Sequence, residues 1–429
     1  MSTGLSDWLP NLPPNWSLRP FYRLMQERDR PNTGLVEMNL LSLSYGNIVE
    51  KNAESNSGLL PASFEGYNIV EPNDIVLRLT DLQNDQRSLR TGQVRKRGII
   101  TSAYVTVIPD ESLHPRFSHY LLHGYDLAKL FYRMGGGLRQ SMKYSDLKHL
   151  PMVVPPSSEQ ERIANFLDEK TARIDALIAE KERLLSTLVE WRSAELSRIC
   201  FGESSLQHQT SNTWLPTLPE GWKTMRLKHL VTGIEQGWSP ECEGRLAEDD
   251  EWGVLKAGAA NAGVYREYEH KALPKSLEPL PELEVKDGDV LITRASGTAD
   301  YVGSFAYVYS TRPKLMLSDK NFRLKFGPEP LLLPELLAWM CNTRVLREQI
   351  LQFVSGADGL AKNIGSGNLR EIWLAVPPLH EQAELVKALH CSRATLEGLA
   401  QHVNEHIARL REYRSSLISA AVTGQLAIQ

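Results

Sequence analysis

The sequence predicts an α+β chain in which two pseudo-symmetric α/β globular modules are separated by two long antiparallel coiled-coil helices. Three observations lead to this prediction: an uninterrupted heptad pattern in mid-chain, a second copy of it near the C-terminus, and short motifs that recur in both halves. The recurring motifs lie about half a chain length apart, which marks one duplicated large unit and not a solenoid of small repeats.

Residues 159–199 carry the first heptad pattern, and no Gly or Pro interrupts it. At about 1.5 Å per residue, such a helix spans roughly 60 Å, which is longer than one compact domain requires. We therefore expect a spacer helix that needs a partner for its apolar stripe. The stripe consists of Leu167, Ile174, Leu177, Leu184, Leu188 and Trp191, widened by Ile178 and Leu185, with Lys170 and Lys181 as polar positions.

Recurring motifs open and close each half of the chain. WLPNLPPNW at Trp8–Trp16 recurs as WLPTLPEGW at Trp214–Trp222. VPP followed by Glu-Gln at residues 154–160 recurs at 376–382. Between these motifs, the apolar run 73–77 corresponds to 288–292. The spacing between equivalent positions grows along the half, so we expect insertions inside the second module.

The second helix is expected at residues 380–422, where the spacing to the first copy stays constant. Val403 stands where the first helix has Lys181, and Gly202 and Gly424 occupy equivalent places where a helix C-cap glycine is expected. Two helices of equal length can cover each other's apolar stripes by packing antiparallel. The positions equivalent to the first stripe are Leu389, Leu396, Leu399, His406, Leu410 and Tyr413.

The predicted boundaries are 1–157 for the first module, 158–203 for the first spacer helix, 204–213 for a linker, 214–379 for the second module, and 380–429 for the second helix and a tail. β-like runs at 74–80, 98–108, 289–294 and 322–326 are separated by Gly, Pro and Asn turns. Helical patterns cover 116–134 and 334–353, whereas the polar stretch 204–212 is expected to lack regular structure.

Composition limits the classes of function. The formal net charge of −4 and pI near 6.3 give no global basic signature, so any nucleic-acid contact has to come from local patches. The four cysteines lie far apart without CxxC pairing, which argues against a zinc module or a disulfide framework. No signal peptide or apolar membrane span is apparent, so we expect reduced thiols in a soluble cytoplasmic protein.

One catalytic motif needs to be weighed. His402, Glu405 and His406 match the HxxEH pattern of inverted zinc peptidases. His406, however, falls on the helical stripe where the first helix has Leu184, and only a short C-terminal segment follows it to supply a third ligand. We therefore predict no metal site, and because nucleotide-binding, hydrolase and amino-methylation motifs are also missing, we predict no catalysis by this chain alone.

Two glycine-rich loops precede the VPP motifs at equivalent positions, residues 135–143 and 355–363. Glycine lets a backbone approach a phosphate, while Arg, Lys and Asn can pair with phosphates or base edges. A flexible surface turn would have the same composition. The recurrence of such a loop at the same place in both halves, however, favours nucleic-acid contact. A second basic patch, at residues 87–97, lies between two β-like runs, and its counterpart at 291–298 is less charged. The DNA-contact candidates are Arg78, Arg87, Arg90, Arg95, Lys96, Arg97, Arg139, Lys143, Arg294, Ser296, Lys320, Lys362 and Asn363.

Each half has WLPxLPxxW, a variable module, VPPxxEQ and a long helix, and the second helix ends in LISAAVTGQ at 417–425. The order of these features resembles the specificity subunit of type I restriction-modification systems. The resemblance covers essentially the whole chain. It implies that each module is a target-recognition domain that reads one half of a bipartite double-stranded DNA site in the major groove, and that the helix pair fixes the gap between the halves.

The resemblance also implies partners. Two modification subunits, which methylate adenine with S-adenosylmethionine, would dock on the helices, and ATP-dependent restriction subunits would join the assembly. S-adenosylmethionine, ATP and Mg are expected on those partners, and no cofactor is expected in this chain. The residues that the resemblance assigns to docking are Pro155, Pro156, Glu159, Gln160, Pro377, Pro378, Glu381 and Gln382.

The main alternative is a duplicated coiled-coil adaptor that binds only proteins and no DNA. A third reading, a metallopeptidase, rests on the HxxEH match alone.

Overall fold

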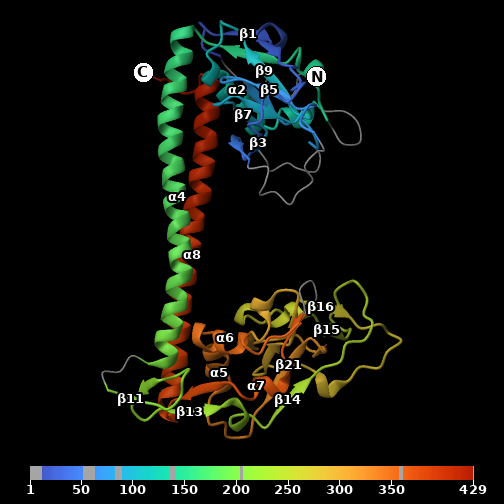
Figure 1. The fold of residues 1–429 in the computed structure, drawn as a ribbon, viewed down its shortest axis with the longest axis vertical. Coiled ribbons are helices and arrows are strands. Elements are labelled where there is room, and N and C mark those ends of the chain that lie inside the picture. The colour runs from blue at the N-terminus through green and yellow to red at the C-terminus, as the bar shows by residue number, and fades with distance from the viewer. Residues whose placement is uncertain are drawn as a thin grey trace. The chain divides into compact units, whose positions relative to one another are not determined.

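The computed structural model describes residues 12–51, 63–82, 89–134, 141–202, 206–356 and 361–428. The chain forms two compact units: unit 1 comprises Met1–Glu182 and Asn404–Gln429, and unit 2 comprises Arg183–Val403. Each unit therefore combines one globular module with the adjoining ends of two long helices, α4 (Ser157–Phe201) and α8 (Leu379–Val422) (Figure 1).

The module of unit 1 is built around a four-stranded antiparallel sheet in the order β2-β9-β6-β7. A hairpin (β3–β4) and two further antiparallel pairs (β1–β10 and β5–β8) surround it. The strands are β1 Ser17–Pro20, β2 Met25–Glu27, β3 Leu41–Ser44, β4 Asn47–Glu50, β5 Asn68–Val70, β6 Ile75–Leu77, β7 Thr91–Gln93, β8 Gly98–Ile100, β9 Val105–Pro109 and β10 Pro151–Val154, and the helices of the module are α2 Pro115–Leu127 and α3 Tyr144–Leu147.

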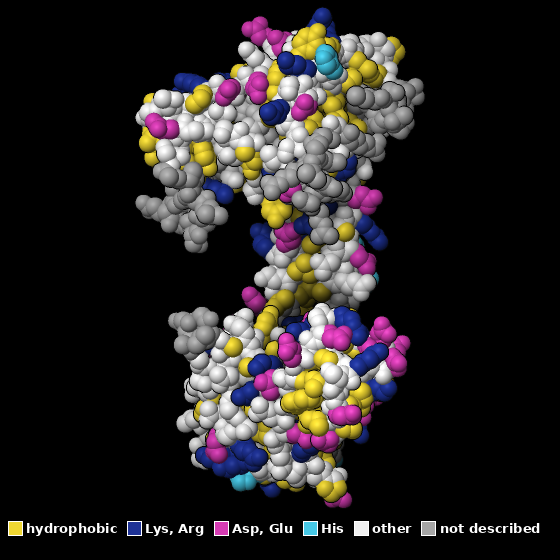
Figure 2. Space-filling view, turned by 90° about the vertical axis from the view of Figure 1, so that its right-hand side faces the viewer, with side chains coloured by type: hydrophobic (Ala, Val, Ile, Leu, Met, Phe, Trp, Pro, Cys, Tyr) yellow, Lys and Arg dark blue, Asp and Glu magenta, His cyan; other side chains and the backbone are white. Residues whose placement is uncertain are grey.

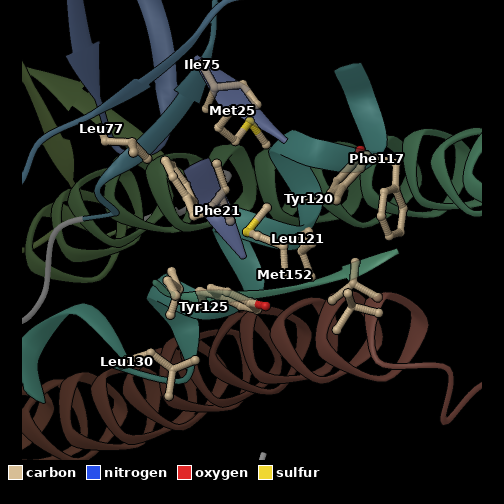
Figure 3. Packing of buried hydrophobic residues seen from close by; sticks show 14 of the residues in the cluster. Phe21, Met25, Ile75, Leu77, Phe117, Tyr120, Leu121, Tyr125, Leu130 and Met152 are labelled. Carbon is tan, nitrogen blue, oxygen red and sulfur yellow. The ribbon is translucent and has the colours of Figure 1, made fainter. Parts of the chain in front are cut away.

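The core of unit 1 lies between this sheet, α2 and the long helices. Phe21, Leu121 and Met152 are fully buried, and Figure 3 shows their side chains converging. Burying each large apolar side chain contributes roughly 1.5–3 kcal/mol. Leu167 of α4 and Ile418 of α8 belong to the same apolar cluster, so the helix ends and the module share one core.

The module of unit 2 repeats this plan with additions. Its four-stranded antiparallel sheet has the order β14-β21-β17-β19. A hairpin, β15–β16, pairs in parallel with β20, as the β3–β4 hairpin meets β8 through the parallel bridge Leu40–Ile99 in unit 1. Among the described residues, the pairs β11–β12 and β18–β22 are additional. The strands are β11 Gln207–Gln209, β12 Thr217–Pro219, β13 Lys223–Arg226, β14 Gly233–Gln236, β15 Gly253–Leu255, β16 His270–Ala272, β17 Val290–Thr293, β18 Ala295–Ser296, β19 Phe305–Tyr307, β20 Leu315–Met316, β21 Asn321–Lys325, β22 Lys362–Asn363 and β23 Trp373–Val376, and the helices are α5 Pro334–Cys341, α6 Arg344–Leu351 and α7 Ser366–Leu369.

The element order confirms the duplication. The pair β1–β10 that brackets the first module corresponds to β13–β23, and the strand order β2-β9-β6-β7 corresponds to β14-β21-β17-β19. Likewise, α2 corresponds to α5, and α3 to α7. The fold therefore agrees with the predicted pair of pseudo-symmetric α/β modules.

Both spacer helices form over the predicted ranges, and they run antiparallel. Two ion pairs in unit 1 show the direction: Arg414 Nε lies 2.9 Å from Asp175 Oδ1, and Arg411 Nη2 lies 2.9 Å from Glu182 Oε1. Residue numbers therefore fall along α8 as they rise along α4. Gly202 and Gly424 follow the helix ends with φ values of 71° and 76°, as expected for C-cap glycines.

The predicted apolar stripe is only half right. Leu167, Ile174 and Leu188 are buried, whereas Leu177, Leu184 and Trp191 are exposed; on α8, Leu389 and Val403 are buried, whereas Leu399, His406 and Tyr413 are exposed. One heptad column of α4 is buried and the other is exposed, because a pair of helices covers only part of so wide a stripe. The module cores bury Leu167, Ile174 and Leu389, whereas Leu188, Val403 and Ile407 are buried outside those cores.

Three local predictions need correction. The run 98–108 is two strands, because a turn closed by the Tyr104 N–H on Thr101 O separates β8 from β9. Helix 116–134 ends at Leu127, since Lys129 has φ 59°, and helix 334–353 breaks between α5 and α6. The stretch 204–212 contains strand β11, which pairs with β12 because the Asn212 side chain accepts hydrogen bonds from the Trp214 and Leu215 N–H groups and closes the turn.

Within the described residues, no helix combines the length and apolarity needed to cross a membrane.

Candidate functional site

The recurring motifs meet each other inside each unit. In unit 1 the indole Nε1 of Trp16 donates to Glu159 Oε2 at 2.8 Å, and in unit 2 that of Trp222 donates to Glu381 Oε2 at 2.9 Å. The last residue of WLPxLPxxW therefore anchors the first turn of the long helix that follows the same module. This anchoring explains why the two motifs recur together.

The glutamine of VPPxxEQ forms a second recurring tie, and it is buried. Gln160 accepts a hydrogen bond from His114 N at 2.7 Å and donates to the Ser112 and Pro155 carbonyls at 3.1 and 2.9 Å. In unit 2, Gln382 accepts from Leu333 N at 2.8 Å and donates to the carbonyls of Leu331 and Pro377, both at 2.9 Å. Each amide thereby satisfies three backbone groups, two of them in the loop that precedes α2 or α5.

The same tryptophans receive the end of the other long helix. A Cβ on Gly424, after α8, would lie 2.6 Å from Pro13 and 3.3 Å from Trp16, while a Cβ on Gly202, after α4, would lie 2.6 Å from Pro219 and 3.5 Å from Trp222. Only glycine fits so close an approach. The last residues of each WLPxLPxxW motif, 13–16 and 219–222, thus join the start of one long helix to the end of the other.

These ties change the interpretation of the docking candidates. Pro155, Gln160, Pro377 and Gln382 are buried, so they cannot contact a partner directly and the docking assignment is wrong for them. Glu159 and Glu381 already accept the indole hydrogen bonds, and Pro156 and Pro378 are half-buried. The physical role of the motif is internal: it fixes the helix start against its module.

Both units expose apolar side chains on their segments of the long helices, Leu184, Val189 and Leu379 among them, and one pair of such residues recurs at equivalent sequence positions in each unit. In unit 1 the pair is Leu177 and Tyr413, 45% and 58% exposed; in unit 2 it is Leu399 and Trp191, 40% and 61% exposed. The two pairs occupy equivalent positions in the duplicated sequence. On the face drawn in Figure 2, apolar side chains lie open along the helices. Large exposed apolar side chains that gather into a patch mark interaction sites.

In unit 2, the structure brings together all the DNA-contact candidates of that module. Strand β18 pairs with β22 in the register Ser296 to Lys362 and Ala295 to Asn363, and the Arg294 N–H donates to Lys320 O at 2.8 Å. Arg294, Lys320 and Lys362 therefore surround one point where two loops meet. The carboxylate of Asp319 lies 3.1 Å from Lys320 Nζ, which leaves this cluster with a net positive charge.

The equivalent point in unit 1 is formed by fewer described residues. The Met142 N–H donates to Leu79 O at 2.9 Å, which places Lys143 beside the loop that carries Arg78, and both side chains are at least partly exposed. Arg87 and Arg139 lie outside the described residues. The prediction for Arg78 and Lys143 thus has a geometric basis, the same loop junction as in unit 2.

Arg90 does not fit the predicted DNA-contact role, because its side chain is fully buried. Its guanidinium donates to Tyr132 Oη at 2.8 Å and to the Arg78 and Thr80 carbonyls at 3.1 and 2.8 Å. A buried arginine needs such partners, and here it organises the loop after β6. The prediction is corrected accordingly: Arg90 supports the loop and does not reach DNA.

The remaining basic candidates of unit 1 lie on the β7–β8 turn. Lys96 pairs with Glu50 at 2.8 Å, and Arg97 pairs with Glu37 at 3.1 Å and Glu71 at 3.6 Å, so their charges are partly compensated. Arg95 is exposed and has no carboxylate partner among the described residues. Arg95 is therefore the cation of this turn that remains open to an anion.

Within the described residues, no three His, Cys, Asp or Glu side chains gather into a group that could hold a metal. Sequence reasoning missed the Trp–Glu and Gln ties. The signal that could have revealed them was the joint recurrence of WLPxLPxxW and VPPxxEQ.

Comparison with known proteins finds specificity subunits of type I restriction enzymes among the similar sequences. No family model matches the chain. Over 173 residues, 40% of the chain, it is 36% identical to the type I restriction enzyme EcoEI specificity subunit of Escherichia coli, and over 291 residues, 66% of the chain, it is 25% identical to the EcoKI specificity subunit of E. coli strain K12. These alignments span 29% and 59% of the two relatives, so the chain matches less than two thirds of either.

A solved structure extends the similarity to the fold. One chain from a study titled as the structural basis of complex assembly and conformational transition of the type I R-M system superposes with a TM-score of 0.67. The match covers 97% of this chain and 100% of the other at 16% identity. Both chains therefore have the same fold along nearly their whole length.

Proposed function

We propose that this chain is a specificity subunit of a type I restriction-modification system and that it selects the DNA sequence on which the complex acts; its similarity to such subunits supports the proposal. Each module reads one half of a bipartite double-stranded site, and the helix pair sets the gap between the halves. The observation that carries this proposal is the internal duplication: two modules of the same strand order, each tied to the start of its own long helix.

The basic loop junctions support the assignment of a DNA-contacting edge. Arg294, Lys320 and Lys362 meet at the β18–β22 pair, and Lys143 meets the Arg78 loop at the equivalent place in unit 1. Phosphate contacts position a protein on DNA, whereas Ser296 and Asn363 at the same junction can read base edges. Because the two junctions carry different side chains, the two half-sites should differ in sequence.

We assign docking of the modification subunits to the exposed apolar pairs on the helices, Leu177 with Tyr413 and Leu399 with Trp191. Two equivalent surfaces fit two copies of one partner. Aromatic side chains surrounded by aliphatic ones are common anchors of such interfaces. In this proposal the chain is not itself catalytic, and S-adenosylmethionine, ATP and Mg belong to the modification and restriction subunits.

A substitution tests the docking surface. W191D should weaken binding of the modification subunit to unit 2 by at least about tenfold, because it replaces a large apolar contact by a charge. Copurification should then fall from two modification subunits to one per chain. V189D is the matched control, since Val189 is equally exposed on α4 but outside the apolar pair; equal loss with both variants would contradict the assignment.

DNA binding separates this function from that of a coiled-coil adaptor that binds only proteins. A mobility-shift series with the chain and its modification partner should give a salt-sensitive complex with one duplex and weaker binding to unrelated duplexes. Equal, weak retention of all duplexes would favour the adaptor. Methylome sequencing of cells with and without the gene supplies the duplex for the assay.

A further inference from the structure

Unit 1 contains a cleft of about 660 Å³ where its module faces α4 and α8. This volume lies in the range of about 300–1,000 Å³ typical of small-ligand sites. Its walls come from the β3–β4 hairpin, the turn before β8, helix α2 and the two long helices. None of the ties or loop junctions described above uses this space.

The charges around the cleft do not balance. Arg116 Nη1 lies 2.5 Å from Asp168 Oδ2, and Arg414 Nε lies 2.9 Å from Asp175 Oδ1, so these two arginines are paired. Arg95 also lines the cleft, and it has no carboxylate partner among the described residues. One guanidinium is therefore available to an anion, and its planar fork suits a phosphate group.

The inner wall carries two histidines, His119 and His123, in a positive environment. Their ring centroids lie 5.9 Å apart; His123 is 4% exposed, and its Nδ1 lies 3.1 Å from Thr91 Oγ1. The Nε2 atom of each imidazole is buried without a hydrogen-bond partner among the described residues, an arrangement that costs stability. Burial, together with the charges of Arg414 and Arg95, lowers the pKa of His119 to about 4. The wall therefore stays neutral while the field within the cleft favours an anion.

The rim presents an aromatic ring. Tyr45, at the tip of the β3–β4 hairpin, is 82% exposed and has φ 46°, a left-handed conformation that is unfavourable for a tyrosine. Its neighbour Gly46 packs so closely that a Cβ there would lie 3.2 Å from Leu89 Cβ and 3.5 Å from His123 Cε1. The hairpin is thus seated on the cleft wall with its aromatic side chain held outward. Tyr45 and Arg95 line the same cleft. Aromatic rings on which bases stack, combined with basic side chains that meet the phosphates, are the usual means of binding single nucleotides of a strand.

Unit 2 provides an internal comparison. The equivalent cleft measures about 230 Å³, and Trp339, Asn342 and Leu396 stand where unit 1 has Tyr120, His123 and Ile174. The pair Arg116–Asp168 is replaced by Glu335–His390, with Nε2 2.5 Å from Oε1. The loop Ala262–Val264 also lines this space. A cleft of this size lies below the usual range for small-ligand sites.

We propose that the cleft of unit 1 is a nucleotide-binding site, with the phosphate on Arg95 and the base stacked on Tyr45. The shared chemistry is a phosphate joined to a planar base, and two sources provide it: a free nucleotide, or a nucleotide of the DNA. The inference concerns unit 1 alone and does not require the proposed function, because a free nucleotide would bind even if the chain read no DNA sequence.

Calorimetric titration of the full chain with AMP and, separately, with inorganic pyrophosphate tests the site. We expect AMP to bind more tightly than pyrophosphate, R95Q to weaken both by about tenfold, and Y45A to abolish only the preference for AMP. R192Q is the matched control, because Arg192 occupies the place of Arg414 in the small cleft of unit 2; it should leave both affinities unchanged. Binding of AMP that is equal in wild type and R95Q, or no binding at millimolar AMP, would overturn the proposal.

A competition experiment identifies the source. Displacement of bound AMP by a short duplex would show that the cleft takes a nucleotide of the DNA, and retention of AMP would point to a free nucleotide; either result supports the site. A failure of the mobility-shift assay with AMP binding intact would remove the proposed function and leave this site in place.

Discussion

Gln160 and Gln382 show how one buried side chain can determine the geometry of a long helix. Each amide uses its carbonyl as an acceptor and both of its N–H groups as donors, so a loop of the module and the first turn of the helix share three hydrogen bonds. A buried polar group contributes in this way only when every partner is present.

Q382E is therefore expected to destabilise unit 2 more than Q382A does. The carboxylate cannot donate to the Leu331 and Pro377 carbonyls. One of its oxygens would instead face these two carbonyl oxygens in a buried site with no hydrogen to share. We expect a loss of about 3 kcal/mol for Q382E. Chemical denaturation measures this, and S366A, a change at the partly exposed start of α7, serves as a control; equal stabilities of Q382E and wild type would contradict the role assigned to the amide.

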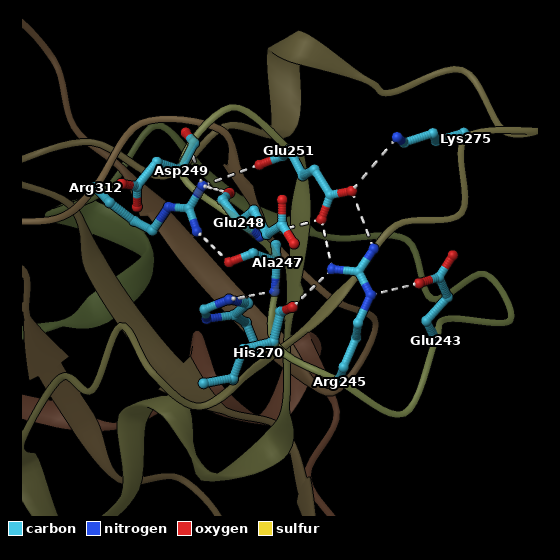
Figure 4. Close-up of polar contacts among 10 residues, drawn as sticks. Glu243, Arg245, Ala247, Glu248, Asp249, Glu251, His270, Lys275 and Arg312 are labelled. Carbon is cyan, nitrogen blue, oxygen red and sulfur yellow. Dashed lines mark hydrogen bonds and ion pairs between the residues drawn. The ribbon is translucent and has the colours of Figure 1, made fainter.

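Glu251 belongs to an acidic loop of unit 2 that three cations hold (Figure 4). The Arg245 guanidinium hydrogen-bonds the carboxylate at 2.6 Å, and the Glu248 N–H and the Lys275 charge assist. These partners lower the pKa of Glu251 from its usual 4.5 to about 2. Arg312 binds the carbonyls of Ala247, Glu248 and Glu251, so the loop is held at its backbone as well.

This lowered pKa predicts an acid-sensitive contribution to stability. Because the folded-state pKa lies below the unfolded one, the contribution is complete above about pH 4.5 and is lost as the pH falls toward about 2. The difference in Tm between wild type and E251Q should therefore shrink over this interval. A difference that stayed constant from pH 6 to pH 2 would show that the carboxylate is not held by its charge.

Among the elements, the two long helices were the most predictable. Their heptad pattern, caps and antiparallel direction follow from periodicity and from the constant spacing between the two copies. Which heptad column is buried could not be deduced, because it depends on where the modules pack. Leu177 and Trp191 therefore looked like seam residues, although both are exposed.

The polar candidates were less predictable for a related reason. A sequence shows that Arg90 stands in a basic run and that Gln160 belongs to a recurring motif, but it does not show which carbonyl groups lie within reach after folding. Both side chains proved to be internal ties. By contrast, composition and recurrence predicted the basic residues of two separate segments, and folding brings them together: β18 pairs with β22, and the Arg294 N–H donates to Lys320 O.

Helix length is expected to set the gap between half-sites. A heptad inserted after Ala179 of α4 needs a matching heptad in α8 between Arg411 and Arg414, because ion pairs on either side fix the antiparallel register. The insertion adds about 10 Å of helix, or at most about three base pairs of DNA. Methylome sequencing should then report a longer gap between unchanged half-sites. An unchanged gap would show that the helices do not determine the spacing.

The whole molecule consists of two modules with separate attachments to the two long helices. Each module has its own sheet, its own core and its own Trp–Glu and Gln ties, so one module can be replaced without disturbing the hydrogen bonds of the other. We therefore expect the two modules to act independently, so that exchanging one leaves the other unchanged.

The most direct test exchanges residues 214–378 for the corresponding segment of a known type I restriction enzyme specificity subunit. The methylome is then sequenced in cells that express the chimaera with the proposed modification partner. We expect one half of the methylated bipartite sequence to change, while the other half and the gap stay as they were. A change in both halves, or methylation of the original sequence alone, would contradict this expectation.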